Sequence, residues 1–361
     1  MKLGVVTTSY PRFAGDPAGS FVAEHVAAMR ADGHAVDVIA AGDGADRIAS
    51  PLFYRGGAPD ALERSPAATA IEAVRFTARL GVEIARRARR WDAIVAHWLA
   101  PSAIAALLAT VPLLAIAHGG DVHTLRRMRL LAPVLHALRV RRARLAFVSE
   151  ALRALAIDSV PSLRGWLASA IVQPMGLAID RFQALPREPA RDPATLVIAS
   201  RLVPIKGVDV AIAAMAHVRT PARLVIAGDG PDRTALARCA PSNVELRGLV
   251  STAERDRLLA RASVVVVPSR VLASGRTEGT PMIALEALAA GVPVVASAVG
   301  GLRELPAVEL VAPDDPRALA GAIDRVLAAP RAAPELRAGV AGLAWPAVAQ
   351  RLLQHLAGEV V

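Results

Sequence analysis

Cysteine and aromatic residues are scarce in this chain, and long apolar runs are missing. Cys239 is the only cysteine among 361 residues, so no disulfide can form within the chain, which fits a reducing cytosol. Aromatic residues make up 3%, and no helix-turn-helix, RRM or zinc-finger pattern occurs, which disfavours nucleic-acid binding. The most apolar region, residues 93–121, is interrupted by His97, Pro101 and Pro112, so no stretch reaches the roughly 18–20 residues of a membrane span.

Several common catalytic and phosphate-binding signatures are also missing. Neither the first strand-to-helix turn, residues 7–26, nor residues 227–233 match G-x-G-x-x-G, so no dinucleotide fingerprint is present. P-loop, G-x-S-x-G and H-E-x-x-H patterns do not occur. No second cluster of ligands completes a metal site, and we expect no metal. The apolar run at the N-terminus is short, so we expect no signal peptide and a cytoplasmic protein.

Lysine is nearly as rare as cysteine. Lys2 and Lys206 are the only lysines among 42 basic residues, and the arginine bias is what GC-rich codon usage would produce. The net charge is +10, and residues 1–183 hold 22 basic against 15 acidic residues. The excess lies in three arginine-rich stretches, residues 85–90, 125–131 and 139–145. Beyond codon bias, this distribution favours an anionic acceptor or an anionic membrane surface as a partner over nucleic acid.

Short β-branched runs alternate with helical stretches along the whole chain, which is typical of parallel sheets wrapped in helices. Two such series occur, and the segment that joins them, residues 180–195, is rich in proline, arginine and aspartate, as linkers are. We therefore predict an α/β fold of two Rossmann-like, doubly wound domains that face each other across a cleft. The predicted parts are residues 1–183, residues 184–340 and a terminal helix, residues 341–361, that returns to the first domain. Ligands of such sheets bind at the carboxyl ends of the strands.

Residues 278–294, EGTPMIALEALAAGVPV, contain the signals of a capped helix. Thr280 is a good N-cap, and Pro281 suits the first turn. Gly291 would end the helix.

The two glutamates of this segment therefore have different environments. Glu278 falls in the loop before the helix, and Glu286 about two turns inside it, so they do not form an acid/base pair on one face. Amides at the helix start, residues 280–283, favour an anion such as phosphate. A phosphorylated, polyhydroxylated ligand would suit this arrangement. Local physics equally allows an ordinary capped helix with a solvated glutamate.

Two further loops follow predicted strands and carry polar residues. Arg201 and Lys206 flank a short loop, where two cations could neutralise a diphosphate leaving group. They could equally be solvated surface cations. His118 ends another strand, with two glycines and then Asp121 after it, and could orient a sugar hydroxyl. The alternative is a structural histidine in a turn.

Together these segments resemble the GT-B glycosyltransferases of the large retaining GT4 family. The resemblance runs nearly end to end, with seven motifs in the right order. They are GSFVAEHVAAMRADGHAVDVIA at 19–40, HGGD at 118–121, FVSE at 147–150, PMGLAIDRF at 174–182, SRLVPIKGVD at 200–209, IAGDGPDR at 226–233, and the Glu-x7-Glu segment with its trailing Gly-Gly-x-x-Glu at 268–305.

The resemblance implies a role for each matching residue. Arg201 and Lys206 would bind the donor's diphosphate, and Glu286 would hold the ribose hydroxyls. Glu278 would face the transferred sugar, and His118 would lie near that sugar's hydroxyls. The donor would be a UDP-sugar or a GDP-sugar, with no further cofactor and no metal.

Four smaller residues complete the implied donor site. Gly19 would let the first loop approach the diphosphate and the acceptor. Gly228 would lie on the nucleotide side, while Gly279 and Thr280 would belong to the donor-binding loop before the helix.

The chain departs from the family pattern at a few positions. Met175 stands where asparagine is usual, and Ser200 where glycine is common. Thr280 replaces a frequent aromatic residue, which leaves a smaller and more polar rim. Arg276 is an additional cation beside Glu278. It indicates either an acidic donor or acceptor, or a salt partner for Glu278.

The resemblance thus implies retaining transfer of a sugar from a nucleoside-diphosphate sugar to an acceptor hydroxyl, in bacterial cell-surface glycan or glycolipid synthesis. The expected partners are the nucleotide-sugar donor, a glycan or lipid-linked acceptor, and an anionic membrane surface, without nucleic acid. Two alternatives remain at this point. One is a nucleotide-sugar epimerase or sugar phosphorylase of the same fold, and the other is a non-catalytic nucleotide-sugar-binding scaffold.

Overall fold

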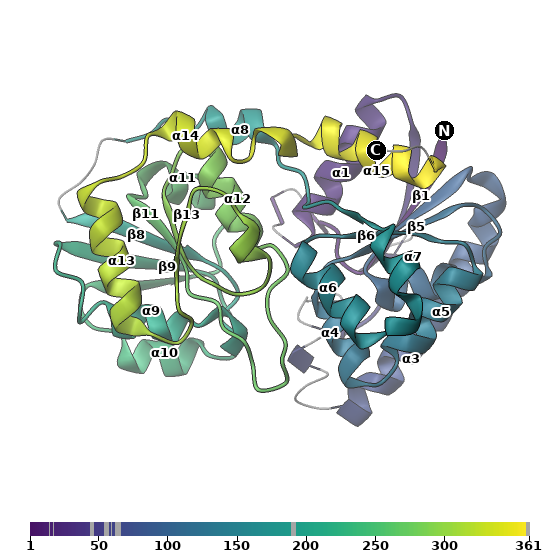
Figure 1. Ribbon diagram of the computed structural model, residues 1–361, viewed down its shortest axis with the longest axis horizontal. Helices are drawn as coiled ribbons and strands as arrows, with labels where there is room; N and C mark the ends of the chain where they lie inside the picture. The colour runs from purple at the N-terminus through teal and green to yellow at the C-terminus, as the bar shows by residue number, and fades with distance from the viewer. Residues whose placement is uncertain are drawn as a thin grey trace. The chain divides into compact units, whose positions relative to one another are not determined.

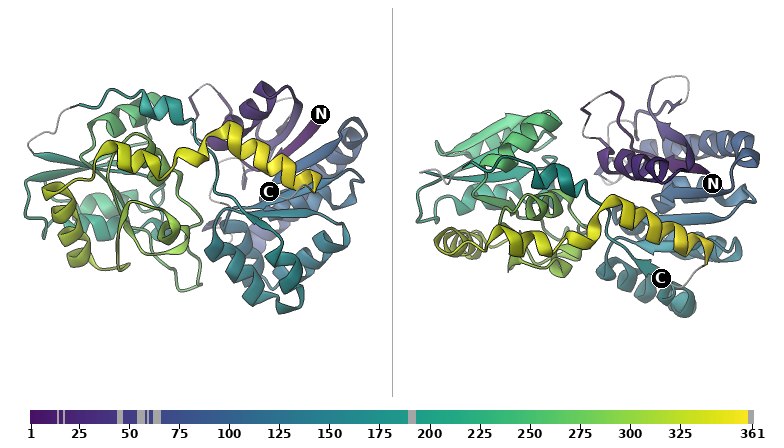
Figure 2. Two further views of the ribbon diagram at one scale, coloured as in Figure 1. Left: turned by 45° about the horizontal axis from the view of Figure 1, so that its top comes forward. Right: turned by 90° about the horizontal axis from the view of Figure 1, so that it is seen from above.

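The structure of the protein is a computed structural model whose chain divides into two compact parts. Unit 1 comprises Met1–Gly176 and Trp345–Val361, and unit 2 comprises Leu177–Ala344 (Figures 1 and 2). The structure describes residues 1–13, 15–16, 18–43, 47–53, 58, 60–61, 66–188 and 193–358.

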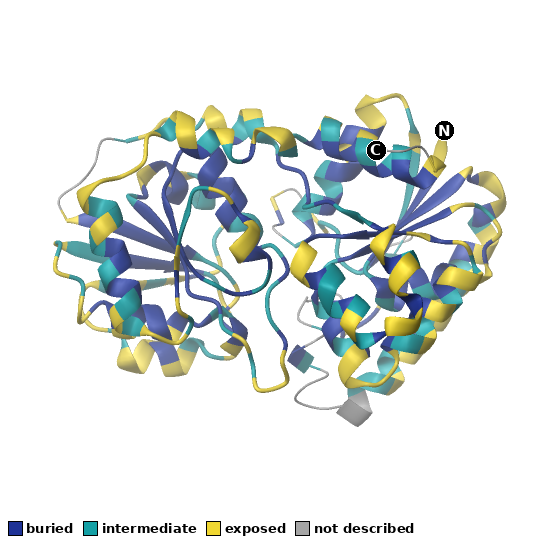
Figure 3. Ribbon diagram, in the orientation of Figure 1, coloured by how far each residue is buried: buried dark blue, intermediate teal, exposed yellow. Residues whose placement is uncertain are grey.

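Unit 1 is built on a parallel sheet whose seven described strands lie in the order β3-β2-β1-β4-β5-β6-β7. Every residue of β4 and β5 is buried, because helices cover both faces of the sheet (Figure 3). The strands are β1 (Lys2–Thr7), β2 (Ala35–Ala41), β3 (Arg47–Ile48), β4 (Ala93–His97), β5 (Leu113–Ala117), β6 (Arg144–Phe147) and β7 (Ile171–Val172).

The helices of unit 1 come mostly from the first half of the chain, and one comes from its end. They are α1 (Ser20–Ala31), α3 (Pro66–Arg87), α4 (Gly120–Arg127), α5 (Leu131–Val140), α6 (Glu150–Ser159), α7 (Arg164–Ala168) and α15 (Trp345–Ala357). Short helical turns lie at η1 (Ala88–Arg90), η2 (Leu99–Ala103), η3 (Ala106–Leu108) and η4 (Pro161–Leu163). Helix α15 packs beside α1, although the two are far apart in sequence.

Unit 2 has a second parallel sheet, with six described strands in the order β10-β9-β8-β11-β12-β13. Apolar clusters lie on both of its faces, because strands such as β11, all valine, are buried throughout. The strands are β8 (Ala194–Ala199), β9 (Ala222–Ala227), β10 (Val244–Gly248), β11 (Val264–Val267), β12 (Val294–Ser297) and β13 (Val308–Val311).

Helices cover both faces of this second sheet. They are α8 (Ile179–Gln183), α9 (Val208–Ala214), α10 (Arg233–Cys239), α11 (Thr252–Arg261), α12 (Met282–Ala289), α13 (Pro316–Ala328) and α14 (Ala333–Ala338). Short helical turns lie at η5 (Pro204–Lys206), η6 (Gly300–Glu304) and η7 (Ala341–Leu343). The prediction of two Rossmann-like α/β units is confirmed.

The two units meet along the chain at positions that differ slightly from the predicted ones. The predicted first boundary lies after residue 183, whereas the structure places the change after Gly176. Helix α8 belongs to unit 2 because Leu177 and Phe182 are part of its apolar core. The second change falls after Ala344, and α15 belongs to unit 1. Part of the predicted linker, residues 189–192, lies outside the described residues.

Among the helices that the structure describes, none has both the length and the apolar character that a membrane span requires.

Candidate functional site

In the second sheet, the direction in which the chain adds successive strands reverses between β8 and β11. From β8 the chain continues outward through β9 and β10, and from β11 it continues the opposite way through β12 and β13. The loops that leave the carboxyl ends of β8 and β11 therefore diverge, and such a switch point is where open α/β sheets bind ligands. The two loops carry Arg201, Lys206, Glu278, Gly279 and Thr280.

An ion pair joins these two loops. The Lys206 ammonium lies 2.9 Å from a Glu278 carboxylate oxygen, and the two side chains are only 20% and 13% exposed. A largely buried pair of this kind leaves a costly lone charge if either partner is removed. Two residues that lie 72 positions apart in the chain, and that were predicted to contact one donor, are thus in contact with each other.

Glycines hold the loop after β8 against its neighbours. A Cβ atom at Gly228 would overlap the Ser200 carbonyl oxygen, and one at Gly230 would overlap the Leu202 carbonyl oxygen. The Leu202 amide donates to the Asp229 carbonyl at 2.8 Å. Gly228 also has a φ of 147°, which other residues rarely adopt. Gly228 therefore fixes the backbone that carries Arg201, a structural reason for this glycine beside its predicted nucleotide contact.

The glycine pair at residues 300–301 supports the Glu278 loop in the same way. The Gly301 amide donates to the Gly279 carbonyl at 2.8 Å. A Cβ atom at Gly300 would overlap the Glu278 carbonyl oxygen, and one at Gly301 would lie 2.7 Å from the Thr280 hydroxyl oxygen. The sequence showed this pair only as part of a motif, without a role.

Three hydroxyl oxygens at this edge of the sheet are buried without a hydrogen bond to any described residue. They belong to Ser200, at the end of β8, to Ser269, just after β11, and to Thr277, beside Glu278. Buried polar atoms in folded proteins nearly always have a partner. A polar ligand with several hydroxyl or phosphate oxygens would suit this edge.

Helix α12 begins one residue later than predicted. Pro281, not Thr280, occupies the N-cap position, with φ −63° and ψ 119°, and no side chain caps the helix. The predicted cap is therefore wrong. Because proline has no N–H group, the first free amide of the helix belongs to Met282. The predicted end is confirmed, since Gly291 has a φ of 73° and donates to the Leu288 carbonyl at 3.0 Å.

Glu286 is buried, 5% exposed, and is paired with an arginine that the sequence did not single out. The carboxylate lies 3.2 Å from the guanidinium of Arg255, on α11. A buried carboxylate requires such a partner. Arg276 is likewise 5% exposed.

In unit 1, the turn after β5 is organised by a buried carboxylate. Asp121 accepts N–H groups from Leu99 at 2.6 Å, from Gly119 at 2.9 Å and from His118 at 3.2 Å. Burial raises the pKa of the Asp121 carboxyl, although these N–H groups act in the opposite direction. The carboxylate fixes the backbone of His118, which is why an aspartate follows the two glycines.

The His118 ring is partly exposed and is hydrogen-bonded on one side. Its Nε2 lies 3.1 Å from Nδ1 of His97, the last residue of β4. Burial, together with the nearby His25, lowers the pKa of His118 to about 3, so the ring is neutral. The sequence did not indicate His25 or His97.

Gly19 lies at the start of α1 in unit 1. It has a φ of 69°, and a Cβ atom there would overlap the Ser9 carbonyl and lie 2.6 Å from the Tyr10 amide nitrogen. Only glycine satisfies both conditions. The loop after β1 thereby approaches the helix start closely, and the predicted contact of Gly19 with the donor stays a prediction.

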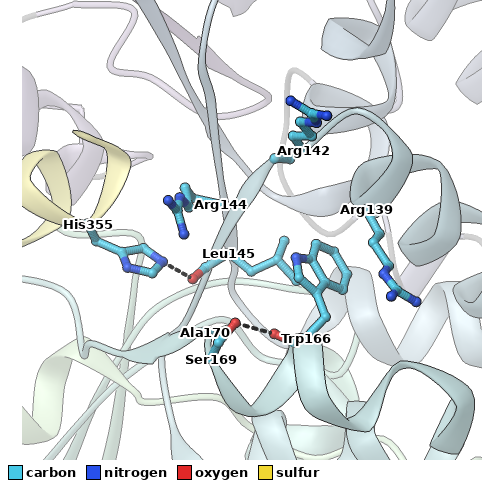
Figure 4. A pocket seen from close by; sticks show the side chains of 9 residues that line it. Arg139, Arg142, Arg144, Leu145, Trp166, Ser169, Ala170 and His355 are labelled. Carbon is cyan, nitrogen blue, oxygen red and sulfur yellow. Dashed lines mark hydrogen bonds between the residues drawn. The ribbon is translucent and has the colours of Figure 1, made fainter. Parts of the chain in front are cut away.

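An open pocket of about 300 Å³ lies elsewhere in unit 1 (Figure 4). It includes Arg144, the first residue of β6, so it lies at the amino ends of the strands, whereas His118 follows a carboxyl end. Arg139, Arg142 and Trp166 also line it, and among the described residues no acidic one does. His355 of α15 closes one side, with its Nε2 at 2.9 Å from the Leu145 carbonyl oxygen.

Comparison with known proteins matches the segment that carries the candidate loops to a described family. Residues 193–329 match the family described as "Glycosyl transferases group 1". A GDP-mannose-dependent alpha-(1-6)-phosphatidylinositol monomannoside mannosyltransferase of Mycobacterium tuberculosis is 36% identical over 157 residues, 39% of this chain and 41% of that protein. A GDP-mannose-dependent monoacylated alpha-(1-6)-phosphatidylinositol monomannoside mannosyltransferase of Corynebacterium glutamicum is 41% identical over 128 residues, 32% of this chain and 34% of that protein. The matches thus span well under half of these curated relatives.

Solved structures resemble the whole chain. Anabaena Alr3699/HepE in complex with UDP-glucose has a TM-score of 0.71 at 18% identity, over 99% of this chain and 100% of that one. The sucrose-phosphate synthase of Thermosynechococcus elongatus has a TM-score of 0.67 at 22% identity, with 98% of both chains covered. These likenesses show the fold, which is GT-B. Residues 193–329 are thus similar to the group 1 glycosyltransferases, and the chain has the fold of these solved structures.

Proposed function

We propose that this protein is a retaining glycosyltransferase of the GT4 family, which transfers a hexose from a nucleoside-diphosphate sugar to an acceptor hydroxyl. The observation that carries the proposal is the contact between Lys206 and Glu278 at the switch point of the second sheet. Both residues lie within the segment that matches the family. The buried hydroxyl groups beside them support a ligand rich in oxygen atoms.

The phosphates would be bound by the loop after β8. Arg201 is exposed at the surface, and Lys206 is partly buried and held by Glu278. As the bond between sugar and phosphate breaks, negative charge develops on the leaving diphosphate. Cations held in a partly desolvated site stabilise this charge. The first amides of α12 would add to this stabilisation. In our proposal these groups take the place of a metal ion.

The sugar and the ribose would be bound by the loop before α12 and by the helix itself. Glu278 would accept hydrogen bonds from the transferred sugar, and Glu286, oriented by Arg255, from the ribose hydroxyls. His118 would donate to a hydroxyl of the sugar. Because the leaving phosphate can accept the acceptor's proton, the proposal requires no separate general base.

The donor nucleotide is left as UDP or GDP. The mannosyltransferase relatives are named for GDP-mannose, whereas HepE is named in complex with UDP-glucose. A transfer assay with radiolabelled UDP-sugars and GDP-sugars and a set of glycolipid acceptors would identify the pair. Release of nucleotide only when acceptor is present indicates transfer. Conversion of the donor without acceptor would indicate an epimerase, and no turnover with any donor that binds would indicate a scaffold.

Variants of Arg201 and Lys206 test the phosphate assignment. Arg201→Ala and Lys206→Ala should each lower the transfer rate by about 10²–10³, the typical effect of removing one group that stabilises developing charge. Arg317→Ala, an exposed arginine of unit 2, is the matched control and should leave the rate unchanged. Unchanged transfer rates in both Arg201→Ala and Lys206→Ala would refute the phosphate assignment.

We further propose a glycan or lipid-linked acceptor at the inner face of the cytoplasmic membrane, in synthesis of a cell-surface glycan or glycolipid. In the part of the chain that the structure describes, no acidic residue lines the pocket formed by Arg139, Arg142 and Arg144, and Val140, next to Arg139 in sequence, is 85% exposed. Exposed arginines with an apolar residue among them suit an anionic lipid surface.

Vesicle sedimentation tests this membrane contact. Vesicles with anionic lipid should pellet the parent protein, and vesicles of neutral lipid should not. A variant with all three pocket arginines changed to glutamine should stay in solution with both. Equal, negligible sedimentation of the parent with both kinds of vesicle would reject the contact.

A further inference from the structure

Three histidines of unit 1 form a hydrogen-bonded row, which we call the histidine chain. Nδ1 of His25, on α1, lies 3.1 Å from Nε2 of His97, at the end of β4. Nδ1 of His97 lies 3.1 Å from Nε2 of His118. His25 and His97 are both fully buried, and only His118 is partly open to solvent. The row thus leads from the interior of the unit to a residue that is partly exposed.

The three rings of the histidine chain are neutral. Burial lowers the pKa of His25 to about 4 and that of His97 well below its ordinary value. Among the described residues, no carboxylate is hydrogen-bonded to any of the three rings. Two acids close to these histidines in the chain bind other groups, since Asp121 accepts backbone amides and Glu24 accepts the Trp345 indole N–H.

The protons of three neutral rings in such a row can be arranged in only two ways. Each of the two junctions needs one N–H and one lone pair, because two N–H groups or two lone pairs facing each other repel. The proton must therefore lie on Nδ1 of all three rings or on Nε2 of all three. The tautomer of His118 is consequently set by His25, which it does not touch.

The buried end of the chain distinguishes between the two arrangements. Nε2 of His25 is buried and has no hydrogen-bond partner among the described residues. The Trp345 ring stacks on the face of His25, with centroids 5.1 Å apart and planes at 12°. A buried N–H group without a partner is rarer in proteins than an under-satisfied acceptor. The arrangement with a bare lone pair at this nitrogen, and all protons on Nδ1, is therefore favoured.

We propose that His25 and His97 are positioning residues that hold His118 neutral with its proton on Nδ1, as an N–H donor for a substrate hydroxyl. The use of this donor rests on the proposed function, whereas the tautomer itself does not. Phe21 packs against the rings of both His97 and His118, at 6.1 and 5.4 Å between centroids, and Trp98 lies 4.7 Å from His118. These aromatic side chains keep water from the junctions.

A metal site is the other use that three histidines suggest, and the geometry disfavours it. Ligands of a metal converge on one point, whereas these nitrogens are paired in sequence along a row. No group of three or more His, Cys, Asp or Glu side chains in the described part of the chain has the geometry to hold a metal.

Nitrogen NMR of protein labelled with ¹⁵N-histidine tests the proposal without any turnover. The parent should show His118 in one neutral tautomer, with the proton on Nδ1. His25→Met removes the donor to His97 and offers a thioether, which accepts but cannot donate, so Nε2 of His97 should carry the proton and the Nε2 tautomer of His118 should become populated. His25→Asn restores an N–H donor near the position of Nδ1 and should restore the parent tautomer. His136→Met, at an exposed helix position of the same unit, is the matched control.

Kinetics add a second readout. His25→Met should lower kcat by about tenfold, the value of one hydrogen bond to the substrate, while the affinity for free nucleotide stays unchanged. A parent spectrum with the His118 proton on Nε2, or a His25→Met spectrum like that of the parent, would overturn the proposal. If His25→Met does not fold, the parent spectrum alone decides. The expected spectra together with an inactive parent would count against the proposed function and not against the histidine chain.

Discussion

Acid should destabilise unit 1 strongly, because folding buries two neutral histidines. His25 and His97 have folded pKa values far below 6.5, so unfolding lets each ring bind a proton that the folded chain does not bind. The unfolded state therefore binds more protons below pH 6.5, and stability falls as the pH falls. For His25, with a folded pKa of about 4, linkage gives a loss of about 2 kcal/mol between pH 7 and pH 5, and the lowered pKa of His97 adds to the loss in the same direction.

This magnitude depends little on the folded pKa. Between pH 7 and pH 5 the titration of the unfolded chain supplies nearly all of the loss, provided that the folded value stays below about 4.5. No loss of stability is counted for His118, because this residue is partly exposed.

Tryptophan fluorescence can follow this unfolding selectively. The four tryptophans of the chain all lie in unit 1, so urea titrations monitored by their emission report on that unit. His25→Phe removes the contribution of one ring. Its destabilisation relative to the parent should shrink by about 2 kcal/mol from pH 7 to pH 5. His136→Phe should show a constant difference from the parent. A constant difference for His25→Phe would refute the reasoning.

Three further outcomes follow from single contacts. Gly301→Ala places a Cβ atom against the backbone of the Glu278 loop, so it should weaken nucleotide binding about tenfold in titration calorimetry. Gly342→Ala, whose Cβ atom would meet nothing within 4 Å, should leave nucleotide binding unchanged. Asp121→Asn leaves buried N–H groups poorly paired, and urea unfolding followed by tryptophan emission should show a loss of about 2 kcal/mol. Glu286→Ala should destabilise unit 2 by about 2 kcal/mol, measured by circular dichroism. Adding Arg255→Ala should recover part of the lost stability, and no recovery would contradict the pairing of the two residues.

The sequence predicted the fold and the two loops of the candidate site because both depend on local signals. Strand periodicity identifies parallel sheets, and residues just after β8 and β11 necessarily lie at one edge of the sheet. The partners of these residues depend on tertiary contacts instead. Arg255 is one of many arginines in an arginine-rich chain, and nothing local marks it as the partner of Glu286.

The histidine chain escaped sequence analysis for a similar reason. His25 and His97 are 72 positions apart, on a helix and a strand, and each looks like an ordinary buried residue of its element. The unit boundaries were also displaced. Helix α8 is short and amphipathic, and only the packing of Phe182 decides which core it joins. The N-cap of α12 differed by one residue, which is the usual precision of helix ends.

Titration calorimetry with UDP and GDP tests the central claim most directly. The claim is that the loops after β8 and β11 form a site for the diphosphate of a sugar donor. The parent should bind one of the two nucleotides with a well-defined heat, Lys206→Ala should bind it at least tenfold more weakly, and Arg317→Ala should bind it like the parent. Equal binding by parent and Lys206→Ala, or binding of neither nucleotide by the parent, would contradict the account.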